Sequence, residues 1–223
     1  MTEVDLSRHF PRSTPAALLA YHLLALVGLY LLPSASTATF LLLLTIEALG
    51  VSETAGAHRL WAHRSYVATT PLKLFLHLGY IVTRPLNQFS LYTFVLLHRT
   101  HHQQCDTQSD PHSPVSNTFL HAHCTWLLKP LHPSTIQAAQ TVEMGDITGD
   151  RLIMLEHRHH GVLHLLLSWL LPVLLPLTWG ESLATSLCLR GLQQVLTMHR
   201  SGLIGSAAHK FGSRPYDKNI EPR

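Results

Sequence analysis

The chain has 223 residues, of which 46% are hydrophobic and 13% charged, about half the charged share of an ordinary globular domain. Its net charge of +3 is too small to indicate a nucleic-acid partner, and its three cysteines show no pairing pattern. The apolar residues are gathered into runs, as in membrane proteins. We therefore expect residues 1–223 to form a single all-α membrane domain.

Four apolar runs are long enough, or nearly so, to form transmembrane helices. They cover residues 16–32, 37–51, 162–178 and 182–204. Residues 72–82 and 86–97 are also apolar but too short to cross a bilayer alone, so we assign them to a cap. An acidic residue is costly in lipid, so the side chain of Glu47 should face protein or a polar cavity.

The distribution of Lys and Arg predicts the orientation in the membrane. Most of these residues lie in the polar blocks and in the tail of residues 1–15, and none lies in the turns at 33–36 and 179–181. By the positive-inside rule, the polar blocks face the cytosol. We expect a flexible cytosolic tail, four transmembrane helices, a cytosolic His-rich cap that binds metal, and cytosolic N- and C-termini.

Histidine is abundant, with 18 residues, and two histidine groups directly follow apolar segments. His98, His101 and His102 are three and four residues apart, so a helix would project them together as metal ligands. His58 and His63 are five apart, which is about 140° around a regular helix. That angle suits two metals with one of these ligands on each. Imidazole suits Zn, Cu, Fe and Ni alike, so the spacing does not name the metal.

Longer motifs around these histidines carry a resemblance to a known family. Residues 54–64 resemble the first histidine box of the membrane acyl-CoA desaturases of the stearoyl-CoA Δ9 type, and residues 98–102 resemble the second. Asp110-Pro-His112 follows at the distance found in that family. Residues 206–209 and 214–219 are similar to the segment before its third box.

The resemblance implies a fold, a reaction and a set of site residues. The reaction is O₂-dependent insertion of a cis double bond, at Δ9, into saturated fatty acyl-CoA. It implies two irons, electrons from cytochrome b5, and a multi-pass location in the endoplasmic reticulum membrane. The implied metal ligands are His58, His63, His98, His101, His102 and His209. The implied substrate-binding residues are Gln88, Tyr92, Phe94, Ser201 and Lys129.

Some positions depart from the family pattern. The third box, HxxHH, would lie beyond Arg223, so the resemblance predicts a chain truncated before the remaining ligands. An asparagine of the family is Gly205 here, and basic or acidic positions near the CoA site are Leu96, Leu97 and Leu131. The His-rich stretch 157–160 occupies a place where the family has no ligand, and we interpret it as a basic interfacial cluster.

Two alternatives to desaturation remain open from the sequence. The same histidine scaffold could carry a fatty-acyl hydroxylase, since one sequence does not separate insertion of oxygen from loss of two hydrogens. The chain could also be a truncated, non-catalytic paralogue that acts by binding full-length desaturase or lipid.

Overall fold

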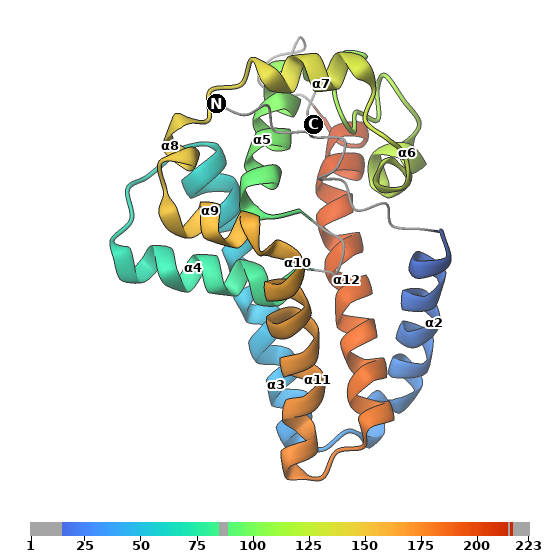
Figure 1. The fold of residues 1–223 in the computed structure, drawn as a ribbon. Coiled ribbons are helices and arrows are strands. Elements are labelled where there is room, and N and C mark those ends of the chain that lie inside the picture. Colours follow the sequence, from blue (N-terminus) through green and yellow to red (C-terminus); the bar gives the residue numbers. More distant parts are fainter. Residues whose placement is uncertain (1–14, 85–88, 214, 216–223) are drawn as a thin grey trace.

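The computed structural model describes residues 15–84, 89–213 and 215. Within these residues every regular element is a helix, which confirms the predicted all-α class (Figure 1). The predicted tail, apart from Pro15, and the predicted tunnel residue Gln88 lie outside the described residues.

Three helical segments are long and apolar enough to cross a membrane: Pro15–Ser34, Thr37–Ala62 and His160–Trp179. Their elements are α2 (Pro15–Leu31), η1 (Leu32–Ser34), α3 (Thr37–Leu49), η2 (Ser52–Ala62), α10 (His160–Leu163), η4 (His164–Leu170), α11 (Leu171–Leu174) and η5 (Leu175–Trp179). The fourth predicted span falls within α12 (Leu183–Lys210), which packs along α2 but is more polar than these three. Its role as a span stays a prediction.

The charged residues of the helical bundle have partners inside the protein. Arg190 of α12 is 1% exposed, and its guanidinium donates hydrogen bonds of 2.7 Å to the carbonyl oxygens of Ser168 and Val82. Glu47 of α3 forms an ion pair with Arg200 of α12, as expected of an acidic residue that faces protein. These contacts explain how α12 keeps polar residues while it packs among apolar helices.

The two turns without Lys or Arg lie together at the end of the bundle opposite the cap (Figure 1). Glu181 Oε2 accepts hydrogen bonds from the backbone N–H of Ser36 at 3.0 Å and from Thr39 Oγ1 at 2.7 Å. The indole N–H of Trp179 donates to Thr39 Oγ1 at 2.9 Å. Both turns therefore lie on the side of the bundle opposite the histidine boxes, and the orientation relative to the cytosol stays a prediction.

The cap gathers at the other end of the bundle. Its elements are α4 (Thr70–Thr83), α5 (Leu91–Gln103), α6 (Phe119–His123), η3 (Thr125–Leu128), α7 (Pro133–Gln140), α8 (Gly145–Thr148) and α9 (Arg151–Arg158). The main core joins η2 to α4 and α5, with Ala57, Tyr80 and Leu91 fully buried. The apolar residues of the cap therefore fix the two histidine-box helices against each other.

Candidate metal centre

His58 and His63 lie on the same face of the first-box helix because η2 is a π-helix. The N–H of His63 donates to the carbonyl oxygen of His58 at 3.0 Å, a five-residue step. Their Nε2 atoms are consequently only 2.9 Å apart. The sequence-based expectation that these histidines point about 140° apart, toward different metals, is wrong because it assumed a regular α-helix.

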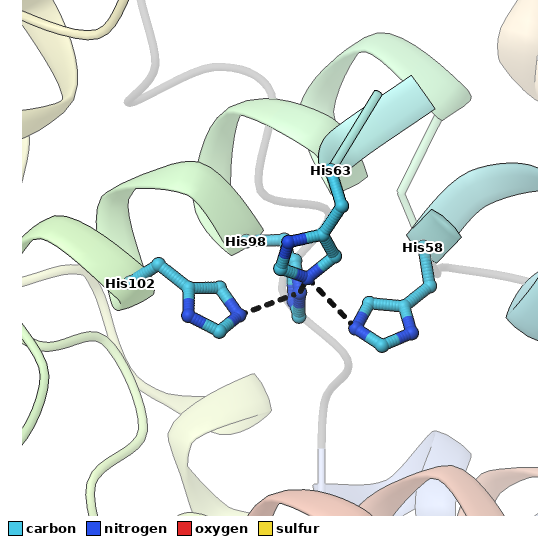
Figure 2. Close-up of side chains that lie close together, drawn as sticks. All are labelled: His58, His63, His98 and His102. Atoms are coloured by element: carbon cyan, nitrogen blue, oxygen red, sulfur yellow. Dashed lines mark hydrogen bonds between the residues drawn. The ribbon is translucent and has the colours of Figure 1, made fainter. Parts of the chain in front are cut away.

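The second-box helix α5 completes a four-histidine centre. Its His98 and His102 are one turn apart with Nε2 atoms separated by 3.1 Å, and His98 Nε2 lies 3.0 Å from His63 Nε2. Figure 2 shows the four rings of this centre, including His58, turned toward one another. Two nitrogen ligands about 2.1 Å from one ion and at right angles would be about 3.0 Å apart. The observed spacings therefore fit a single metal ion.

His101 turns away from this centre, so the expectation that all three second-box histidines project together is wrong. Its ring centroid is 6.1 Å from that of His98. A three-residue step and a four-residue step leave a helix on opposite sides of the starting residue. Because of this, His102 follows His98 into the four-histidine centre and His101 does not.

His101 instead belongs to a second group with His209 at the end of α12. His101, Cys105 and His209 place ligand atoms within 4.8 Å of one another, and the rings of His101 and His112 are 4.5 Å apart. Nδ1 of His101 donates to Asp110 Oδ1 at 2.8 Å, with both residues 3% exposed. A carboxylate on one ring nitrogen leaves the other, Nε2, free to bind metal.

The histidines outside the spans are held in the form that binds metal. Burial, and then repulsion from neighbouring imidazoles, lowers the pKa of His98 and lowers that of His102 to about 4. Burial and the positive charge of Arg99 lower the pKa of His63. Neutral imidazoles are the metal-binding form, and four of them accommodate iron as well as other transition metals. The donor set therefore fits the predicted iron.

Asp146 ties the two histidine boxes together from outside. Its carboxylate accepts hydrogen bonds from Arg64, just after the first box, at 2.8 and 2.9 Å, and from Arg99, within the second, at 2.8 and 3.0 Å. Burial raises the pKa of Asp146, but the hydrogen bonds from both guanidinium groups lower it more, so the net pKa lies below its usual range. The carboxylate is therefore more acidic in the folded chain than in the unfolded chain.

We expect Asp146→Asn to lower the melting temperature near neutral pH and to loosen the two boxes. A depressed pKa contributes stability that is present above the unfolded value of about 3.9 and is lost as pH falls through the folded value. The difference from the unsubstituted chain should therefore shrink below about pH 4. Thermal unfolding at several pH values measures it. Glu143→Gln, which removes a carboxylate that is 70% exposed, is the control and should have little effect. A pH-independent difference would contradict this role.

A cavity of about 320 Å³ opens beside both histidine groups. Phe94 and Ser201, two predicted tunnel residues, line it together with Trp126. Tyr92 is not among the described lining residues; it is 5% exposed and its ring packs 4.6 Å from that of His157. Lys129 is exposed and also lies off the described cavity wall. The substrate roles of these residues stay predictions.

A buried ion pair in the cavity wall is not apparent from the sequence. Glu53 accepts a hydrogen bond from Arg84 at 2.6 Å and from Ser201 Oγ at 2.8 Å. In the sequence, Glu53 precedes the first histidine box and Arg84 lies between two short apolar runs. The sequence shows only that two opposite charges flank apolar helices. That pattern does not predict that the two side chains contact each other.

Comparisons with known proteins bear on the family. The chain is 40% identical over 205 residues to "Acyl-CoA desaturase 1" of Tachysurus fulvidraco, and 38% identical over 207 residues to "Stearoyl-CoA desaturase" of Homo sapiens. This chain is a homologue of the acyl-CoA desaturases. The similarity covers 91% of the chain in each comparison. It confirms the resemblance that the motifs indicated. No model of a protein family matches the chain.

The same comparisons show how much of each relative the chain covers. The chain spans 60% of the fish desaturase and 56% of the human one. It is also 38% identical over 205 residues to "Acyl-CoA Delta(11) desaturase" of Choristoneura rosaceana. Because these relatives differ in the substrate or bond position that their names give, similarity to them does not assign the position of a double bond.

Proposed function

We propose that this chain forms the acyl cavity and the four-histidine metal centre of a membrane acyl-CoA desaturase. The reaction removes one hydrogen from each of two adjacent methylenes of a saturated acyl-CoA and leaves a cis double bond. The observation that carries the proposal is the convergence of four Nε2 atoms beside a cavity of about 320 Å³. No amino-acid side chain removes hydrogen from an unactivated methylene, so this chemistry requires a metal and O₂.

Iron is the metal that the family relationship favours. His58, His63, His98 and His102 would hold one iron, and His101 and His209 would contribute to a second. Bound iron supplies the activation of O₂. In the overall balance, O₂, two electrons, two protons and the two hydrogens of the acyl chain give two molecules of water. Cytochrome b5 is the proposed electron donor.

The remaining contacts describe what the residues of the chain do around that centre. The rings of Phe94 and His98 stack at 5.7 Å, so Phe94 places an apolar wall directly beside a ligand. Asp110 holds His101 through Nδ1 and keeps its Nε2 available. Arg84 and Ser201 hold the carboxylate of Glu53 in the cavity wall. We propose Δ9 as the position because the matched motifs resemble those of the stearoyl-CoA type.

The proposed location is the endoplasmic reticulum membrane, with both termini and the cap in the cytosol. We expect protease added to sealed microsomes to remove a tag placed at residue 1 and a tag placed after Arg223. A tag inserted in the turn at 33–36 should be protected, because that turn lies at the opposite end of the bundle. Protection of the tag after Arg223 would contradict this topology.

Expression in a desaturase-deficient yeast tests the proposed reaction. We expect the polypeptide of residues 1–223 alone not to support growth, because its second group contributes only His101 and His209 from the implied ligand set. Fusion to a relative's segment that contains an HxxHH box should restore growth and yield palmitoleate or oleate. Mass spectrometry of the fatty acids locates the double bond and detects hydroxylated products.

The alternatives give different results in the same experiment. Hydroxylated acyl chains without monounsaturated ones would favour a hydroxylase. A fusion that binds two irons but forms neither product would favour a non-catalytic binding role. Growth on residues 1–223 alone would show that the second group functions with His101 and His209 as ligands and does not need the added box.

A further inference from the structure

A separate group of metal-binding side chains lies where α9 meets the third span. Glu156 lies in α9, His160 begins α10 and His164 begins η4, so the three occupy successive helical turns. One ligand atom from each lies within 4.8 Å of the others. His160 Nδ1 is 2.8 Å from Glu156 Oε1, and His164 Nε2 is 3.5 Å from the same oxygen.

A fourth side chain approaches this group from the cap. Nε2 of His77, in α4, lies 4.0 Å from the other carboxylate oxygen of Glu156. Glu156 and His164 are each 2% exposed, and His77 is 7% exposed. Four potential ligands from two parts of the fold therefore surround one small buried space.

Three buried ring nitrogens of this group, on His77 and His164, lack hydrogen-bond partners. Neither ring nitrogen of His164 makes a hydrogen bond, and Nε2 of His77 makes none. An unsatisfied buried polar group costs about 1–3 kcal/mol, and native proteins keep few of them. All three nitrogens belong to side chains that approach the same carboxylate. A cation bound between these rings and the carboxylate would satisfy Nε2 of His77 and one of the two ring nitrogens of His164.

The proposed desaturase site does not account for this group. None of the four side chains lies in a histidine box or lines the described cavity. The interpretation of residues 157–160 as a basic interfacial cluster is incomplete, because the side chain of His160 is only 21% exposed and turns toward Glu156. His159, its neighbour, is exposed.

We propose that Glu156, His160 and His164, with His77 as the fourth ligand, form a structural site for a divalent transition metal. Zinc fits the set best, since tetrahedral ligation by histidines and one carboxylate is a common zinc arrangement. The partial exposure of His160 gives the ion a route to the site.

The contacts around Glu156 indicate what a bound ion would stabilise. Glu156 Oε2 accepts a hydrogen bond of 3.0 Å from the N–H of Leu91, the first residue of α5. The second histidine box lies near the other end of α5. A metal between His77 and the Glu156–His164 segment would join α4 to the third span and hold the base of the second-box helix.

Zinc binding by the purified chain in detergent tests the proposal. Because imidazole also suits zinc, the histidine boxes would compete for it, so the test uses a His58→Ala/His102→Ala background, in which the four-histidine centre loses half its ligands. We expect this background to retain one zinc per chain that depends on His164. Adding His164→Leu should remove that zinc, whereas adding His159→Leu, the matched exposed control, should not.

Thermal unfolding gives a second readout that does not depend on the background. In the chain with intact boxes, His164→Leu should lower the zinc content by one equivalent. It should also reduce the rise in melting temperature that zinc produces. Without metal, His164→Leu should change the melting temperature little, because neither ring nitrogen of His164 makes a hydrogen bond. Unchanged zinc content in His164→Leu, or an equal loss in His159→Leu, would overturn the proposal.

Discussion

Replacing His63 by Ala is expected to remove most of the iron that the chain binds. His63 is central to the four-histidine centre, with its Nε2 atom 2.9 Å from that of His58 and 3.0 Å from that of His98. Loss of a hydrogen-bond partner behind a ligand already costs about 10–100-fold in metal affinity, and loss of the ligand itself should cost more. Elemental analysis of the purified chain after dialysis against iron measures the effect.

Two further variants make this result specific. His209→Ala removes a member of the second group and should lower the iron content much less than His63→Ala. His159→Ala replaces an exposed histidine outside both groups and should leave the iron content unchanged. Iron retained in His63→Ala, or lost equally in His209→Ala, would show that the four-histidine group is not the principal site.

Asp110→Asn is expected to weaken metal binding at the second group by about 10–100-fold. The carboxylate contacts Nδ1 of His101 at 2.8 and 2.9 Å and also accepts from the N–H of Asp106. The neutral amide no longer provides the charge that favours a proton on Nδ1, so Nε2 of His101 is less often the free nitrogen. Iron titration of the fusion that carries an HxxHH box measures both affinities.

The four-histidine centre serves as an internal reference for this variant. Its affinity should change little in Asp110→Asn, because none of its members contacts Asp110 among the described hydrogen bonds. Asp150→Asn is the control, since the side chain of Asp150 caps α9 and contacts neither histidine group among the described hydrogen bonds. Equal weakening at both centres would indicate general loss of folding instead of a local effect on His101.

The sequence predicted the helices and named the candidate metal ligands because both depend on local patterns. The apolar runs predicted the helices of the bundle. The four-residue step from His98 to His102 predicted that these two side chains lie on one face of a helix. The placement of His58 and His63 was misjudged because a π-helix is set by hydrogen-bond register, which the spacing of these two residues does not reveal.

Contacts between distant segments were beyond sequence reasoning for a different reason. Glu53 pairs with Arg84, and His77 approaches Glu156, only after separate helices pack together. Helical periodicity relates residues within one element and carries no information about such pairs. The interpretation of residues 157–160 was incomplete for this reason, since His160 and its partner Glu156 face a ligand group that includes a cap helix.

X-ray absorption at the iron K edge, on the chain loaded with one equivalent of iron, is the most direct test of the four-histidine centre. We predict scattering from four imidazole rings in the unsubstituted chain, from His58, His63, His98 and His102. In His63→Ala the signal from iron-bound imidazole should fall, and added iron should remain largely unbound. A spectrum dominated by oxygen ligands, or one that is unchanged in His63→Ala, would contradict this centre.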